Sequence, residues 1–481
     1  MNRVTALILS AALTFTMVGA PAPATAHAAA CVPGAENDFD GDGLRDLAVG
    51  TPLGADGGRV LVTYTSTGST VTIGQQTSGV PGSGADGDLF GFALASYDRD
   101  ADGCDELVVG GPGKLAGGAP GAGMVWILPG ARGGLNTAAT EILTQNSTGF
   151  PGVPESGDLF GHSLAAGLTG TQPYLAIGSP GENLNDGPDE GHVYYLRAGE
   201  VVTLHQDKPN VADESEPGDW FGETVVATPT HVIVSVSGEN SAGADGSGAV
   251  AVFAHRFAGA SLAPLATVGQ DSAGVSDAPE PGDAFGGGLS AIPYRPEGAG
   301  ETGTLLAVSA VGEDLAGLAD AGMAQTLFVS PAGLVSQVGE YTQAGEGVEG
   351  EPEADDMFGT AVRLTGTDGA AYATPATATL TLTSAGGEDV HPGYGAVQVF
   401  ALDGVPGDGD LWIAPGRAGL PPGAWGDHSV VGSTPDWLCL PGWSDEGAVV
   451  FGLRWSDLRT GGPAAASAWP AGDDLNVFAI A

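Results

Sequence analysis

The chain has 481 residues, more than an ordinary single-core domain holds, so we expect several domains or a repeat array. The chain contains 82 Gly and 33 Pro, and aromatic and β-branched residues are spread evenly between them. This pattern favours many short strands over long helices. With 58 acidic against 14 basic residues, the formal net charge of −44 argues against nucleic acid and anionic membranes as partners. Such a charge favours bound divalent cations, the alternative being a merely soluble acidic surface.

Residues 1–30 read as a secretory signal peptide. Arg3 supplies a positive start, residues 4–18 an apolar run, and residues 26–28 a small-residue cleavage site. The apolar run is too short to span a bilayer, and no later stretch reaches about 18 apolar residues. We therefore expect residues 31–481 to be secreted, extracellular or associated with the cell envelope, without a transmembrane segment.

Three cysteines remain in the exported chain, and disulfides persist in the oxidising compartment that it enters. Cys31 and Cys104 both lie close to an acidic loop, and we expect them to pair. A lipid-anchored Cys31 is the alternative. Cys439 alternates with apolar neighbours, which predicts a buried free thiol.

A short marker recurs along the chain: an acidic residue, one spacer, then Phe-Gly. The steps between successive phenylalanines are 70, 61, 64 and 73 residues, and a weaker sixth copy follows 67 residues later. The copies are Asp88-Leu89-Phe90-Gly91, Asp158-Leu159-Phe160-Gly161, Asp219-Trp220-Phe221-Gly222, Asp283-Ala284-Phe285-Gly286, Asp356-Met357-Phe358-Gly359 and Trp425-Gly426.

Each marker precedes a series of short apolar segments. In the second unit, residues 92–95, 107–110 and 124–127 read as three strands, and a less regular fourth leads to the next marker. Four short antiparallel strands per unit, repeated radially, make a propeller blade. We predict an all-β fold over residues 31–481, a seven-bladed β-propeller with blades starting near residues 38, 88, 158, 219, 283, 356 and 425.

The two ends of the chain complement each other. The N-terminal unit begins at its acidic loop, at Asp38, and lacks a marker and a first strand. Residues 474–481 match residues 88–95 in pattern and so supply the missing piece. We predict that this C-terminal strand completes the first blade and closes the ring, because closure removes exposed sheet edges. The alternative is a frayed tail.

Two units carry acidic residues at alternating positions between their first and second strands. Carboxylates occupy loop positions 1, 3, 5 and 9, with Gly at position 6 and a backbone carbonyl available at position 7. Such hard oxygens suit Ca²⁺, which takes six to eight ligands, and no Cys/His set favours zinc or copper. The predicted ligands of the two sites are Asp38, Asp40, Asp42, Leu44 and Asp46, and Asp98, Asp100, Asp102, Cys104 and Glu106.

These loops differ from the helical calcium loop, which needs a glutamate at position 12. That position holds Val49 or Val109 here, within an apolar strand. We therefore expect a nine-residue strand-to-strand loop, or alternatively an acidic turn without metal.

Three other polar patterns invite a functional interpretation. Residues 161–165 resemble a hydrolase nucleophile elbow, but the fifth residue is Ala and no Ser recurs at this position of the repeat, which argues against catalysis. The marker acid recurs from blade to blade, as expected of a turn cap. A further recurring acid follows the second strands and forms either an acidic ring for a cationic or carbohydrate ligand or simply solvated turns; its copies are Glu182, Glu239, Glu313 and Glu388.

The markers, together with Gly-x-Pro turns at residues 50–52, 110–112 and 178–180, resemble the FG-GAP repeat. That repeat is the blade unit of the integrin α-chain head and of many secreted bacterial proteins. The resemblance implies a seven-bladed propeller with calcium in the loops between strands one and two. It also implies ligand binding on the opposite face, which the loops between strands two and three and between blades form.

The resemblance names no ligand. Because the acids are spread around the repeat instead of converging on one place, we predict a calcium-stabilised binding or adhesion module without catalytic activity. Its ligand is an unknown extracellular protein or glycan. The alternatives are a secreted hydrolase of glycans or phosphoesters with its site on the loop face, and a purely structural envelope component.

Overall fold

The computed structural model describes most of residues 31–481. The described residues are 31–32, 34–54, 56–184, 187–384, 397–422, 424, 431–444, 447–459, 466–470 and 479–480. The predicted signal peptide, the weak marker Trp425-Gly426 and most of the predicted closing segment, residues 474–478 and 481, lie outside these ranges.

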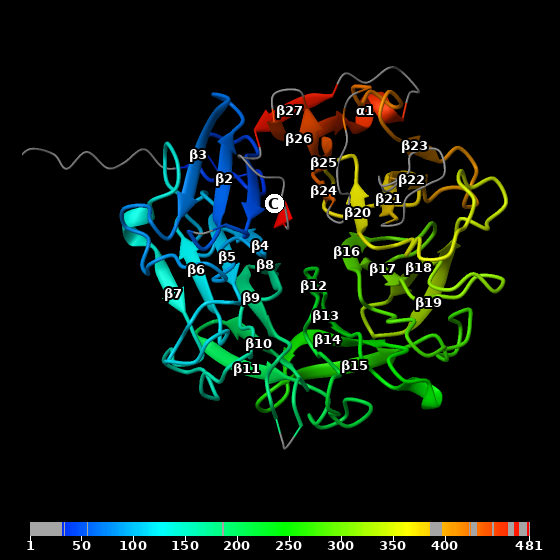
Figure 1. The fold of residues 1–481 in the computed structure, drawn as a ribbon, viewed down its shortest axis with the longest axis horizontal. Helices are drawn as coiled ribbons and strands as arrows, with labels where there is room; N and C mark the ends of the chain where they lie inside the picture. The colour runs from blue at the N-terminus through cyan, green and yellow to red at the C-terminus, as the bar shows by residue number, and fades with distance from the viewer. Residues whose placement is uncertain are drawn as a thin grey trace, which may run out of the picture.

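Seven four-stranded antiparallel sheets are arranged around a central axis in the described part of the chain (Figure 1). The chain runs once around the ring, from the blue blade through cyan, green and yellow to red (Figure 1). This architecture confirms the prediction of an all-β, seven-bladed propeller. A short helix α1, Trp455–Leu458, and the 3₁₀ turns Thr137–Ala139 and Ser241–Gly243 lie outside the sheets.

The strands of the first four blades are β28 (Ala479–Ile480), β1 (Leu47–Thr51), β2 (Arg59–Tyr64) and β3 (Ser69–Gly74); β4 (Leu94–Tyr97), β5 (Glu106–Gly111), β6 (Met124–Leu128) and β7 (Glu141–Leu143); β8 (Leu164–Thr169), β9 (Gln172–Ser179), β10 (His192–Arg197) and β11 (Glu200–Leu204); and β12 (Val225–Ala227), β13 (His231–Val236), β14 (Ala249–Phe257) and β15 (Leu262–Val268). The last three blades consist of β16 (Leu289–Tyr294), β17 (Gly303–Ala310), β18 (Met323–Val329) and β19 (Val335–Tyr341); β20 (Val362–Gly366), β21 (Ala378–Thr383), β22 (Val397–Ala401) and β23 (Leu411–Ile413); and β24 (Gly432–Ser433), β25 (Trp437–Ser444), β26 (Gly447–Arg454) and β27 (Ser467–Pro470).

The position of a strand within its blade explains its sequence pattern. Strands β5 and β17 are buried along their whole length, because neighbouring blades cover both of their faces. Apart from Glu106 at the start of β5, the residues of these strands are apolar or small, as in buried parallel sheets. The outer strand β19 alternates between exposed and half-buried residues, since only one of its faces packs on the protein.

The marker phenylalanines fill the spaces between blades. Phe160 packs against Val108 of β5 on one side and against Ile177 and Tyr194 of the following blade on the other. Its ring centroid lies 5.3 Å from that of Tyr194, in an edge-to-face arrangement. The five marker phenylalanines are at most 1% exposed: Phe90, Phe160, Phe221, Phe285 and Phe358. Burial of one such ring contributes up to about 3 kcal/mol, which explains why the marker recurs at these five blade boundaries.

The glycines of the two family motifs meet across the blade boundary. A Cβ on Gly50 would lie 2.0 Å from the carbonyl oxygen of Gly91, and one on Gly110 would lie 2.1 Å from that of Gly161. The Gly-x-Pro turn of one blade therefore needs glycine, because the Phe-Gly backbone of the next blade touches it.

The C-terminal strand β28 closes the ring, as predicted. Ile480 pairs with Val49 of β1 and Ala479 pairs with Gly50. The Ile480 side chain also covers Gly432 of β24, where a Cβ would lie 2.5 Å from the Ile480 Cγ2 atom. The strand thus joins the first blade to the last.

Removal of residues 479–481 is expected to lower the melting temperature. The truncated chain loses the β1–β28 pairing and the apolar contacts of Ile480, worth about 1–3 kcal/mol. Thermal unfolding followed by circular dichroism measures the change. Ile480→Val is the matched control, expected to cost about 1 kcal/mol or less. An unchanged melting temperature in the truncated chain would rule out a stabilising closure.

Candidate metal centre

Two acidic loops lie close together at one end of the first two blades. The first acidic loop, residues 38–46, precedes β1, and the second acidic loop, residues 98–106, joins β4 to β5. In each loop the carboxylates at positions 1, 3 and 5 gather, with one oxygen from each lying within 4.8 Å of the others. These two sets are Asp38, Asp40 and Asp42, and Asp98, Asp100 and Asp102.

Backbone amides orient the carboxylates of the first acidic loop. The Asp42 amide donates to Asp38 Oδ1 at 3.1 Å and to Asp40 Oδ1 at 3.2 Å. The Gly43 amide donates to Asp38 Oδ2 at 2.7 Å, and the Leu44 amide donates to Asp42 Oδ1 at 2.8 Å. The loop therefore holds three carboxylates around one point through its own main chain.

The second acidic loop repeats this scheme position by position. The Asp102 amide donates to Asp98 Oδ1 at 3.1 Å and to Asp100 Oδ1 at 3.2 Å. The Gly103 amide donates to Asp98 Oδ2 at 3.1 Å, and the Cys104 amide donates to Asp102 Oδ1 at 2.8 Å. Two loops with the same internal bonds present the same set of oxygens.

Both loops require a left-handed backbone at positions 4 and 6. In the first acidic loop these are Gly41 and Gly43, with φ of 69° and 93°. In the second they are Ala101 and Gly103, with φ of 61° and 89°. An alanine in this conformation costs about 1 kcal/mol, so the second loop keeps the same shape under local strain.

The carboxylates at position 9 have a role that the spacing alone did not reveal. Asp46 accepts the Phe39 amide at 3.0 Å and the Thr65 amide at 3.1 Å. Glu106 accepts the Arg99 amide at 2.6 Å. Each closes its loop by binding the amide at position 2 and does not belong to the three-carboxylate set. Metal ligation by these two side chains and by the carbonyls of position 7 stays a prediction.

Charge is concentrated in these loops. Burial raises the pKa of Asp40, and the negative charge of Asp42 raises it further. Burial also raises the pKa values of Asp46 and Glu106 to about 7. A divalent cation among the carboxylates would remove this repulsion, and three carboxylates with nearby carbonyls are the hard oxygen donors that calcium takes. The described residues therefore fit Ca²⁺.

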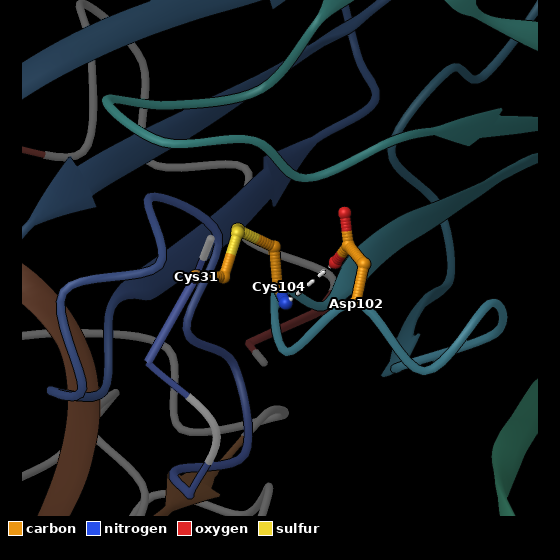
Figure 2. Close-up of side chains that lie close together, drawn as sticks. All are labelled: Cys31, Asp102 and Cys104. Atoms are coloured by element: carbon orange, nitrogen blue, oxygen red, sulfur yellow. Dashed lines mark hydrogen bonds between the residues drawn. A yellow bond between two sulfur atoms is a disulfide. The ribbon is translucent and has the colours of Figure 1, made fainter. Parts of the chain in front are cut away.

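A disulfide joins Cys31 to Cys104, as predicted (Figure 2). The Cα atoms are 5.5 Å apart, and Asp102 lies beside the bond because its carboxylate accepts the Cys104 amide (Figure 2). Both sulfurs are used in the disulfide, so these residues offer no thiolate to a metal. Cys439 is a buried free thiol, also as predicted, and burial raises its pKa to about 12.

The two acidic loops are connected directly. The Asp105 amide donates to the Asp38 carbonyl at 3.0 Å, and the Asn37 amide donates to Asp105 Oδ2 at 2.7 Å. Gly41 packs on the disulfide, so closely that a Cβ there would lie 2.5 Å from Cys104 Sγ. The loops form one structural unit across the boundary between blades one and two.

The other polar motifs have structural roles. Ser163 Oγ donates to the Gly222 carbonyl at 2.8 Å, and His162 Nδ1 lies 3.1 Å from the Glu223 carbonyl, so both side chains link neighbouring blades. The marker acids cap turns as predicted. Each accepts the amide three residues before it, in the pairs Asp88 with Ala85, Asp158 with Glu155, Asp219 with Glu216, Asp283 with Glu280 and Asp356 with Glu353.

The expectation for the second recurring acid is wrong. Glu182, Glu239 and Glu313 are buried, with 3–8% of their surface exposed, and form neither an acidic ring nor solvated turns. A glutamine from the connection that enters each blade reaches each of them, in the pairs Gln145–Glu182, Gln206–Glu239 and Gln270–Glu313. Glu388 lies outside the described residues.

One family model and one integrin segment match the repeat. The FG-GAP repeat family model matches residues 34–63, which include the first acidic loop and β1. Integrin alpha-PS2 of Drosophila melanogaster is 38% identical over 77 residues, which is 16% of this chain and 5% of the integrin. The chain thus spans a small part of that relative's length.

Two solved structures are similar over most of the chain. One is a protein from Lactobacillus plantarum, with a TM-score of 0.47, 13% identity and coverage of 90% of this chain and 98% of the other. The second, from Bacteroides uniformis, is described as a candidate 6-phosphogluconolactonase, with a TM-score of 0.45, 10% identity and coverage of 91% and 98%. Among the described residues, no helix has the length and apolar character needed to cross a membrane.

Proposed function

We propose that this FG-GAP β-propeller is a secreted, calcium-stabilised binding or adhesion module without catalytic activity. The observation that carries the proposal is the matched pair of three-carboxylate loops, held by identical backbone bonds at the boundary of blades one and two. The FG-GAP match and the similarity to an integrin α-chain segment support a binding role.

Bound calcium would supply positive charge that holds three carboxylates together in each loop. The first acidic loop leads into β1, which pairs with the closing strand β28. The second leads into β5, at the centre of the next blade. Calcium bound in these loops would therefore stabilise the part of the ring where the two chain ends meet. In this proposal the ligand binds to a different surface of the propeller.

The ligand face in this proposal lies at the opposite end of the blades. Because β4 and β5 are antiparallel, the β5–β6 loop emerges at the end away from the second acidic loop. The connections between blades run beside these loops; Phe160, for example, bonds through its amide to the Ala122 carbonyl. We propose an extracellular protein or glycan as the ligand of this surface, and secretion or cell-envelope association as the location.

A binding screen paired with an activity screen tests this proposal. The calcium-loaded exported chain is applied to a glycan array and to a panel of purified extracellular proteins, and is incubated with glycoside and phosphoester substrates. Saturable binding without turnover is expected. Asp100→Ala is the matched control, expected to retain ligand contacts because Asp100 lies on the calcium side. Turnover that a single carboxylate substitution on the loop face abolishes would establish a hydrolase instead.

A further inference from the structure

Four equivalent polar clusters lie where the connection entering a blade meets that blade's loop between its second and third strands. Each contains a glutamine that follows an outer strand, the marker aspartate, and one residue that follows a second strand. The clusters are Gln75, Asp88 and Lys114; Gln145, Asp158 and Glu182; Gln206, Asp219 and Glu239; and Gln270, Asp283 and Glu313.

The first cluster is electrically balanced. The Lys114 ammonium donates to Asp88 Oδ2 at 2.7 Å and to the Ser83 carbonyl at 2.7 Å. The Gln75 amide donates to the same Asp88 oxygen at 3.0 Å. Asp88 and Lys114 are both more than nine-tenths buried, so the ion pair neutralises a carboxylate that little water reaches.

The other three clusters carry glutamate where the first has lysine. In the last of them, Gln270 Nε2 donates to Glu313 Oε2 at 2.8 Å, and the other two glutamates accept their glutamines in the same way. Each cluster thus places a second carboxyl group beside the marker aspartate, in the pairs Asp158–Glu182, Asp219–Glu239 and Asp283–Glu313.

Each of these three pairs contains buried oxygen atoms that accept no hydrogen bond. The marker aspartates Asp158, Asp219 and Asp283 are at most 1% exposed, and their Oδ1 atoms have no hydrogen-bond partner. The glutamine Oε1 atoms are buried and unpartnered in all four clusters, that of Gln75 included, so the marker Oδ1 atoms alone set these three clusters apart from the first. A buried acceptor without a donor is costly, so each pair lacks one positive charge or one proton.

The charged groups that surround each glutamate are acidic. A proton bound to the carboxyl pair is therefore the simplest source of the missing positive charge and hydrogen-bond donor. Glu182 faces Asp158 and Glu155, with the phenol of Tyr194 beside it. Glu239 faces Asp219 and Asp213.

Glu313 faces Asp283 and Asp277. Two buried carboxylates side by side cannot both stay ionised, and such pairs share a proton in other proteins. In agreement, burial raises the pKa of Glu182 to about 8, of Glu239 to about 7 and of Glu313 to about 8. The next largest cause is the negative charge of Asp158 for Glu182 and of Asp219 for Glu239, whereas for Glu313 the exposed Asp277 comes before Asp283.

We propose that Glu182, Glu239 and Glu313 each retain a proton in mildly acidic solution, Glu182 and Glu313 at neutral pH as well, and act as three pH-sensitive latches. Each latch holds the connection between two blades against the loop that follows the second strand of the next blade. These segments border the proposed ligand face. The loops of that face are therefore well ordered at acidic pH and become less ordered at mildly alkaline pH. The first cluster has Lys114 in place of the glutamate and so contains no such pair of acids.

The sign of the pH dependence follows from the raised pKa values. Between about pH 4.5 and pH 8 the folded glutamates keep protons that the unfolded chain has released. The stabilisation is therefore complete below about pH 4.5 and is lost as the pH rises to about 8.

The experiment compares melting temperatures from pH 5.5 to 8.5 in saturating calcium. The wild-type chain is measured beside the triple variant Glu182→Gln/Glu239→Gln/Glu313→Gln, whose amides replace the protonated carboxyls. The wild-type melting temperature is expected to fall by at least about 5 °C more than that of the triple variant. Equal pH profiles would overturn the proposal.

A converse variant keeps the test decisive if the triple variant does not fold. Lys114→Glu creates a fourth acid pair and is expected to steepen the pH profile, while Glu182→Lys copies the first cluster and is expected to flatten it. Titration with Na⁺, K⁺ and Mg²⁺ at pH 8.5 distinguishes a proton from a metal. Recovery of the wild-type melting temperature by one of these cations, absent in the triple variant, would overturn proton retention.

Discussion

Loss of the Cys31–Cys104 disulfide is expected to lower the free energy of unfolding by about 4 kcal/mol. The bond closes a loop of 73 residues between the N-terminal segment and the second blade, and a loop of this length strongly restricts the unfolded chain. The variant is Cys31→Ser/Cys104→Ala, because Cys104 is wholly buried and a hydroxyl there would lack a partner. Chemical denaturation in saturating calcium measures the difference.

The controls for this variant use the chain's own third cysteine. A dithiol reductant is expected to destabilise the wild-type chain and a Cys439→Ala chain alike, and to leave the double variant unchanged. Because Gly41 packs on the disulfide and Cys104 occupies position 7 of the second acidic loop, calcium binding at both loops should weaken together. A double variant with the wild-type denaturation midpoint would show that the bond contributes no stability.

Substitution of one aspartate in each acidic loop is expected to remove calcium sites one at a time. Titration calorimetry should find about two sites in the wild-type chain, one in Asp40→Ala or Asp100→Ala, and none in the double variant. At a calcium concentration about one hundredfold above Kd, each lost site corresponds to about 2.7 kcal/mol of stabilisation. Extracellular calcium modules often have Kd values of about 10⁻⁴ to 10⁻³ M, so this excess requires about 10 to 100 mM calcium.

The substitution Asp40→Ala is not expected to destabilise the chain when calcium is chelated. Asp40 is buried beside Asp42, so its removal relieves repulsion, and the calcium-free Asp40→Ala chain should be at least as stable as the calcium-free wild type. Asp86→Ala is the matched control, since Asp86 is exposed and lies outside both loops. Two sites remaining in the Asp40→Ala chain would contradict the assignment of the first acidic loop.

Much of the fold could be predicted from local patterns in the sequence. The marker Phe-Gly recurs at five blade boundaries because one ring fills the space between two sheets and one glycine admits the neighbouring backbone. The missing first strand of the first unit and the matching C-terminal segment predicted the closure that β28 makes. The acidic spacing also identified the carboxylates at positions 1, 3 and 5 that the structure brings together.

Two features of the sites could not be predicted in this way. Asp46 and Glu106 continue the acidic spacing, yet each binds the amide at position 2 of its own loop, which depends on how the loop folds back. Glu182 belongs to a segment that reads as a polar turn. Its burial depends on Gln145, 37 residues earlier in the chain, and on Asp158 in the same connection.

The sequence by itself determined the architecture of this protein: seven blades, a closing strand, two acidic loops and one disulfide. Period and spacing suffice for these features because each repeat obeys the same local packing and turn chemistry. Only the tertiary structure decided which acids face water, which are paired in the interior, and that the two acidic loops form one unit. Those properties depend on contacts between blades, where distant residues meet and burial changes the energy of a charge.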